Sequence, residues 1–111
     1  MQLPEDGMLL RIFVSETDKH KGKPLHEQIV LKARELQVAR VAVLRGMMGF
    51  GADGHIQTDK ILRLSLDLPI VIVLVDTEES LMRLMPFLDD AVDEGMVTIE
   101  QVKVIKYRQR R

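Results

Sequence analysis

The stretch Ile70-Val71-Ile72-Val73-Leu74-Val75 decides the fold, because it predicts a strand with no polar side chain on either face. A strand with one solvated face alternates apolar and polar residues, and this stretch does not alternate. Both of its faces must therefore be covered in the folded protein.

One amphipathic helix is predicted before this strand in the sequence and another after it. The helix after it begins with a capping box at Asp76-Thr77-Glu78-Glu79, an acid followed three residues later by glutamate. Pro86 lies inside the helical pattern, which predicts a kink or a division there. The helix before the strand begins at Pro24. The apolar stripes are Leu81, Leu84, Met85, Leu88 and Val92 in the later helix, and Leu25, Ile29, Ala33 and Leu36 in the earlier one.

Three more strands complete the pattern, over residues 8–14, 38–44 and 96–107. The last of them changes phase near Gln101, which predicts a bulge or bend. A short extended piece is predicted at residues 61–64. The order β-α-β-β-α-β predicts an α+β fold of the ferredoxin-like type, in which two helices cover one face of a four-stranded antiparallel sheet.

Two helices leave the second face of such a sheet without a cover. The segment Val41-Ala42-Val43-Leu44 has no polar position either, so this second face is also apolar. Self-association of the chain is the simplest way to bury it. The alternative is that residues 61–64 fold back over this face.

Length and composition fit a single domain over residues 1–111, with residues 1–7 as a disordered or extended N-terminal segment. Sixteen basic and seventeen acidic residues give a net charge of −1, which offers no attractive field to nucleic acid. The chain has no cysteine, its N-terminus does not resemble a signal peptide, and its longest apolar run, at 68–75, is too short to cross a bilayer. We expect a cytoplasmic protein.

Residues 46–54 hold four of the seven glycines and are predicted to form a loop. Arg45 ends the preceding strand, where its guanidinium can pair with a phosphate. Three glycines permit positive φ and let backbone N–H groups converge on an anion: Gly46, Gly49 and Gly51. The alternative is a flexible hairpin excursion with Phe50 packed against a neighbouring subunit. His55 shares this segment.

A second basic segment precedes the first helix. Lys19, His20 and Lys23 lie just before a helix N-terminus, whose free N–H groups favour anions. The alternative is a solvated loop in which acids and lysines pair with one another. Lys103, on the last strand, can reach a phosphate on a neighbouring chain.

The sequence offers little for metal binding or catalysis. The three histidines are not spaced as metal-binding pairs, so no metal is expected. No nucleophile elbow is present, and no serine has an evident histidine and acid partner. We therefore expect a protein that is not an enzyme. The alternative is a small nucleotide hydrolase with His20 or His55 as its base.

Three motifs in order, together with the pattern over residues 8–106, resemble the family called domain of unknown function (DUF) 190, which is PII-like. The motifs are Glu16-x-Asp18-Lys19-His20-x-Gly22-Lys23-Pro24-Leu25, Arg45-Gly46-x-x-Gly49-Phe50-Gly51 and Leu64-Ser65-x-Asp67-Leu68-Pro69. The resemblance implies the trimeric ferredoxin-like architecture of PII signal proteins, which bind adenine nucleotides in clefts between subunits. It also implies a regulatory role toward an unknown protein target, such as a membrane transporter.

The resemblance implies a nucleotide site but no required cofactor. Its expected residues are Arg45, Gly46, Gly49, Phe50, Gly51, Lys19, His20, Lys23, His55 and Lys103. The loop over residues 51–60 is the implied element that senses effectors or touches a partner. PII proteins carry a basic phosphate loop between the second helix and the last strand, whereas this chain has the acidic Asp93-Glu94-Gly95-Met96. This departure favours AMP or ADP over ATP. The alternative function is an interaction module that acts on a transporter or enzyme without a small ligand.

Overall fold

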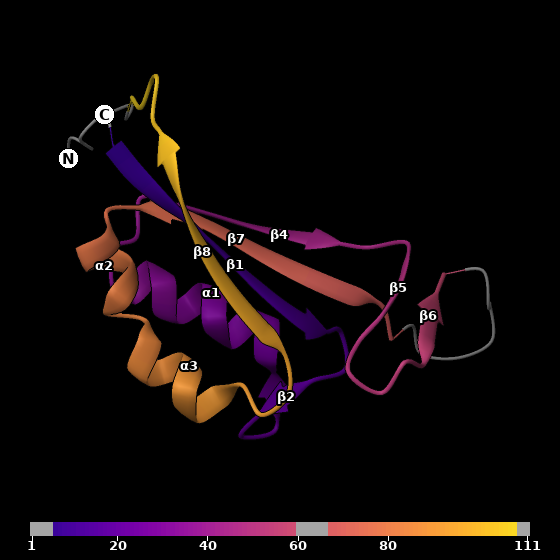
Figure 1. Ribbon diagram of the computed structural model, residues 1–111. Helices are drawn as coiled ribbons and strands as arrows, with labels where there is room; N and C mark the ends of the chain where they lie inside the picture. The colour runs from indigo at the N-terminus through magenta and orange to yellow at the C-terminus, as the bar shows by residue number, and fades with distance from the viewer. Residues whose placement is uncertain (1–5, 60–66, 109–111) are drawn as a thin grey trace.

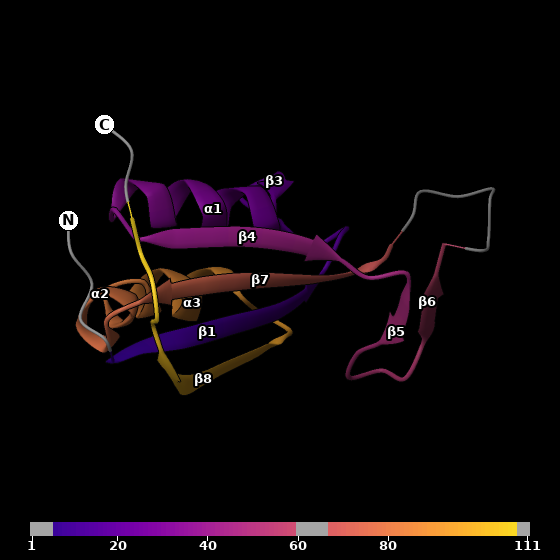
Figure 2. The same cartoon turned by 90° about the horizontal axis from the view of Figure 1, so that it is seen from above.

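The computed structural model describes residues 6–59 and 67–108 and has the predicted ferredoxin-like arrangement (Figure 1). Four antiparallel strands form one sheet in the order β4-β7-β1-β8, visible from above in Figure 2. The predicted piece at residues 61–64 lies outside the described residues. The sheet strands are β1 (Asp6–Ser15), β4 (Arg40–Arg45), β7 (Pro69–Asp76) and β8 (Met96–Lys103).

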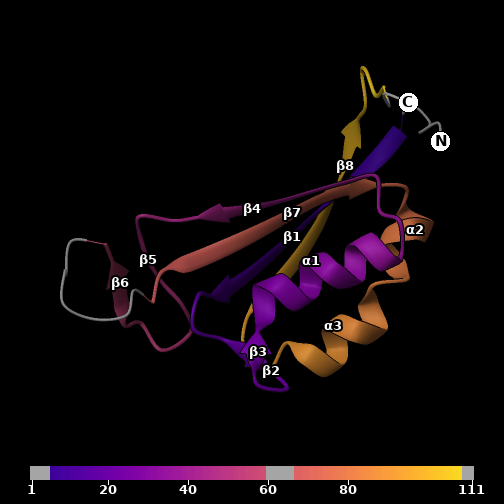
Figure 3. The ribbon, with the colours of Figure 1, turned by 180° about the vertical axis from the view of Figure 1, so that it is seen from behind.

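All helices lie against one face of this sheet (Figure 3). They are α1 (Leu25–Glu35), α2 (Glu78–Met82) and α3 (Met85–Ala91). The core between the two layers consists of Leu10, Ile12, Val14, Leu25, Ile29, Ala33, Ile70, Ile72, Leu74, Leu81, Leu84, Leu88 and Ala91. The central strands β1 and β7 supply alternate residues to it, as a pleated strand must. None of the helices in the described ranges is long and apolar enough to cross a bilayer.

The second helical segment is divided, as predicted. Pro86 lies in the first turn of α3, where its missing N–H costs no hydrogen bond. The N-cap of α2 is Thr77, whose Oγ1 accepts a hydrogen bond from the Ser80 N–H. The capping box predicted to begin at Asp76 is therefore absent, and a single N-cap one residue later, at Thr77, takes its place. Asp76 is buried, and it accepts hydrogen bonds from the Ala39 and Thr77 N–H groups at 2.8 and 2.6 Å.

The bulge predicted near Gln101 is absent. Strand β8 pairs with β1 in unbroken register from Asp6↔Lys103 to Phe13↔Met96. The side chain of Ile99 lies on the helix-facing side of the sheet, whereas that of Val102 lies on the other side. The strand contains no extra residue between them. Backbone hydrogen bonds do not depend on side-chain polarity, and β8 is an edge strand where both environments are tolerated.

Among the described residues, nothing covers the sheet face opposite the helices. Its two central strands place Phe13, Val71 and Val73 on this open face. Leu44 and Met96 of the edge strands extend the apolar surface, and they are 56% and 61% exposed. One ion pair, Arg11 to Glu100, lies among them. An apolar face of this extent is typical of a surface that another protein chain covers.

Two small hairpins project from the same end of the sheet and differ from the prediction. The segment at 46–54 is not wholly loop, because β5 (Met48–Phe50) pairs with β6 (Ile56–Thr58). The 15–23 connection also contains β2 (Lys19–His20), which pairs with β3 (Lys23–Pro24). The β5–β6 hairpin extends beyond the N-terminal end of β7 (Figure 2).

Candidate functional site

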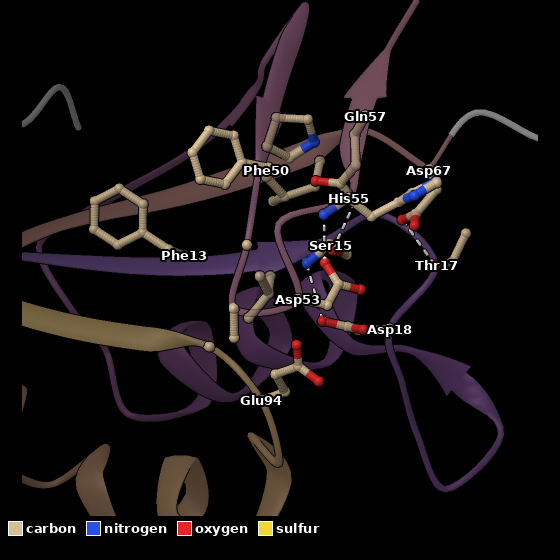
Figure 4. Close-up of a pocket in the computed structure, with 16 residues that line it drawn as sticks. Phe13, Ser15, Thr17, Asp18, Phe50, Asp53, His55, Gln57, Asp67 and Glu94 are labelled. Atoms are coloured by element: carbon tan, nitrogen blue, oxygen red, sulfur yellow. Dashed lines mark hydrogen bonds between the residues drawn. The ribbon is translucent and has the colours of Figure 1, made fainter.

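A pocket of about 280 Å³ lies where the β5–β6 hairpin meets the sheet (Figure 4). Its walls come from four segments that are distant in the sequence: the end of β1, the hairpin, the start of β7 and the loop before β8. The side chains labelled in Figure 4 are Phe13, Ser15, Thr17, Asp18, Phe50, Asp53, His55, Gln57, Asp67 and Glu94. The volume is just below the range of about 300–1,000 Å³ that is usual for ligand pockets.

The hairpin is attached to the body by one of its two faces. Gly46 donates its N–H to the Pro69 carbonyl oxygen at 2.8 Å. A Cβ on Gly49 would lie 3.2 Å from Pro69 Cγ, so the backbone packs directly on the proline ring. Gln57 Nε2 donates to Ser15 Oγ at 2.9 Å. These contacts hold the pocket wall against the ends of β1 and β7.

The predicted reason for the glycines is wrong. Among the described glycines only Gly22 and Gly54 have positive φ, at 79° and 71°. Gly46 is required by close approach, since a Cβ there would lie 2.8 Å from Pro69 Cγ. The structure therefore does not show backbone N–H groups of the three predicted glycines converging through left-handed geometry.

The pocket is acidic. Asp18 accepts a hydrogen bond from the Ser15 N–H at 2.9 Å, and Asp67 accepts one from Thr17 Oγ1 at 2.8 Å. Asp53 accepts one from the His55 N–H at 2.9 Å. Each of these donors is neutral, so the carboxylate charges are not compensated by the bonds.

Arg45, the predicted phosphate ligand, lies beside the pocket in an ion pair with Glu16. The guanidinium makes two contacts with this carboxylate, Nε to Oε2 at 2.9 Å and Nη2 to Oε1 at 3.0 Å. Its side chain is 46% exposed, so it is accessible to an incoming anion. In the single chain, however, the guanidinium of Arg45 already has an acidic partner.

The predicted basic segment lies elsewhere. His20 packs edge-on against Phe87 of α3 with ring centroids 5.4 Å apart, and its Nε2 is 3.9 Å from Asp90 Oδ2. Lys19 and Lys23 are exposed on the β2–β3 hairpin. None of these three residues lines the pocket.

Lys103 lies at the other end of the sheet, opposite Asp6 in the β1–β8 register. There it lines a second pocket of about 400 Å³. One chain therefore divides the ten predicted site residues among three places. Those at the hairpin are Arg45, Gly46, Gly49, Phe50, Gly51 and His55, of which Phe50, Gly51 and His55 line the pocket.

Most residues of the pocket wall were not predicted from the sequence, including Phe13, Ser15, Gln57 and Glu94. A signal for two of the missed acids was nevertheless present. Asp18 and Asp67 stand in the first and third motifs of the family resemblance, and the structure brings these motifs together at the Thr17–Asp67 hydrogen bond. Across the described ranges, no group of three histidine or acidic residues is arranged to hold a metal ion.

Residues 7–104 match the family DUF190, described as Uncharacterized ACR. The chain belongs to this family. A relative of this DUF190 protein, a UPF0166 protein of Aquifex aeolicus (strain VF5), is 34% identical over 99 residues, which cover 87% of this chain and 91% of the relative. The family predicted from the three motifs is thus confirmed.

Two solved structures share the fold of this DUF190 protein. One is CPII from Thiomonas intermedia K12, a nitrogen regulatory PII-like protein bound to ADP, AMP and bicarbonate, with a TM-score of 0.65 and 18% identity over 91% of this chain and 90% of that one. The other is a putative PII-like signaling protein from Thermus thermophilus, with a TM-score of 0.64 and 16% identity over 90% of each chain. The predicted PII-like fold is confirmed.

Proposed function

We propose that this chain is a PII-like regulatory protein that forms a homotrimer, binds an adenine nucleotide between its copies and thereby regulates a partner protein. The observation that carries the proposal is the position of Phe13. Its side chain lies on the open face of the sheet and also lines the pocket. Copies that cover the open face would therefore also close the pocket.

The proposal is supported by the character of both surfaces. A second copy presents the same apolar face, so self-association buries it without any other partner. The rings of Phe13 and Phe50 give the pocket flat apolar surfaces on which a base can stack. CPII, which shares the fold, was solved with ADP and AMP.

Calorimetry tests the proposal directly. The purified protein is titrated with AMP, ADP, ATP and cyclic dinucleotides. We expect saturable heat with an adenine nucleotide and one ligand per chain. Absence of heat with all of these ligands contradicts nucleotide binding.

Arg45 lies at the end of β4, on the chain that leads into the hairpin, and replacing it gives a sharper test. Arg45→Ala should weaken nucleotide binding by about 1.5–3 kcal/mol, because a hydrogen bond to a charged group is lost. Arg34→Ala is the control, since it removes the same charge from an exposed position on α1. Equal affinity in the two variants would remove Arg45 from the site.

A second candidate function is an interaction module that binds a transporter or an enzyme through the hairpin without a small ligand. The observation that favours it is the outer face of the hairpin. Met48 and Ile56 lie on the hairpin face opposite Gly49 and Gln57 and are 54% and 60% exposed. Capture of a partner that persists after exhaustive removal of nucleotide would favour this function.

A further inference from the structure

The charge of the pocket wall limits which adenine nucleotide the proposed site can accept. Four carboxylic acids line it, namely Asp18, Asp53, Asp67 and Glu94. Among its described lining residues there is no lysine or arginine. Nucleotide sites that hold polyphosphates instead surround them with cations and backbone N–H groups.

These carboxylates have no cationic partner within the described part of the chain. The ion pairs found there are Arg11–Glu100, His20–Asp90, His26–Glu27, Lys32–Glu35 and Arg45–Glu16, and none includes a pocket acid. The hydrogen bonds that the pocket acids accept come from neutral groups. Within the described residues, no ion pair therefore neutralises their negative charges.

Two of the acids are placed to act on a ligand. Asp53 is near the tip of the hairpin and Glu94 is in the loop before β8, so they approach the pocket from different walls. Both are exposed, and Figure 4 shows their carboxylates near that of Asp18. A phosphate chain that extends from a base stacked on the aromatic rings would pass into this negative region.

We propose that the site selects adenine nucleotides with a single phosphate, and that Asp53 and Glu94 set this limit by repelling further phosphates. The inference rests on the proposed nucleotide site and deepens it. Each added phosphate brings about one more negative charge near the carboxylates, whereas Arg45, which is paired with Glu16 beside the pocket, supplies a single positive charge. One phosphate can use this cation, and a second or third meets four carboxylic acids and no lysine or arginine among the described lining residues.

Calorimetry with AMP, ADP and ATP in EDTA and about 150 mM salt tests the inference, since EDTA prevents a divalent cation from masking phosphate charge and the Debye length is then about 8 Å. We expect AMP to bind at least tenfold more tightly than ATP, with ADP between them. The AMP preference should decrease as salt is raised, because the repulsion is screened.

Charge-neutralising variants identify the residues. Asp53→Asn and Glu94→Gln should each reduce the ratio of ATP to AMP dissociation constants about threefold or more, and the double variant should reduce it further. Asp93→Asn is the matched control, because Asp93 is exposed beside Glu94 but does not line the pocket. It should leave the ratio unchanged.

The outcomes separate this inference from the proposed function. ATP binding as tightly as AMP keeps the nucleotide site and overturns the selectivity. An AMP preference that neither pocket substitution reduces overturns the role of Asp53 and Glu94. If no adenine nucleotide binds, the proposed function fails and the inference fails with it.

Discussion

The two faces of the sheet have similar side chains but very different surroundings. On β7, Ile72 and Leu74 point toward the helices and are fully buried, whereas Val71, Val73 and Val75 on the other face are only partly buried. All five are branched aliphatic residues. The two faces of β7 are equally apolar. The burial of its side chains therefore depends on what covers each face.

The same comparison explains where the candidate site lies. The helix-covered face packs into the core. Most of the described residues that line the candidate pocket lie outside this core. The open face continues through Phe13 into the pocket. A second copy over the open face would therefore also contact the pocket at Phe13, whereas a change at Ile72, which lies in the core and does not line the pocket, should act on stability.

The largest expected effect comes from a charge on the open face. Val73→Asp should prevent self-association, because an unpaired carboxylate cannot be buried between copies at low cost. Sedimentation velocity should show a change from three chains to one. The separate chain should remain folded, since Val73 lies on the open face and is only partly buried there, so the new carboxylate can stay in contact with water.

The control for this variant is Leu31→Asp, which adds the same charge to an exposed position on α1 that is 47% exposed. It should leave the sedimentation coefficient unchanged. Assembly that survives Val73→Asp would show that the open face is not the contact surface.

The second effect is on the helix-covered face. Ile72→Ala should reduce the free energy of unfolding by about 2–5 kcal/mol, because it leaves a cavity between fully buried neighbours. Urea unfolding at fixed protein concentration measures it. A loss below about 1 kcal/mol would contradict the close packing of this core.

The smallest expected effect is at the junction of the pocket and the open face. A Cβ on Gly95 would lie 2.6 Å from the Phe13 carbonyl oxygen, so Gly95→Ala should cost about 1–3 kcal/mol through strain. Gly51→Ala is the control, because no atom lies within 4 Å of its Cβ position. Equal urea midpoints for the two variants would contradict the close approach at Gly95.

The sheet and the helices could be predicted because their signals are local. Each signal affects only residues close to it in the sequence. The structure confirms the strand at 70–75, the helices with their apolar stripes and the division at Pro86. The strands β5 and β6 were not predicted because each has three residues, too few for alternation to show, and residues 46–54 hold four glycines. The absence of a bulge at Gln101 shows that a phase change alone does not require an extra residue.

The candidate site could be predicted only in part, since it depends on segments brought together by the fold. Thr17 and Asp67 are fifty residues apart in the sequence and share a hydrogen bond in the pocket wall. Arg45 was identified from its position at the end of a strand, but its pairing with Glu16 required the folded chain. The pocket's acidity, for the same reason, could not be inferred from single residues.

The mass of the unmodified protein in solution, measured by light scattering, tests the central claim most directly, because closure of the pocket depends on a second copy covering the open face. We expect three times the chain mass of 12.7 kDa at micromolar concentration. A mass of one chain would mean that the open face stays in contact with water and that no seam between copies exists to hold a nucleotide.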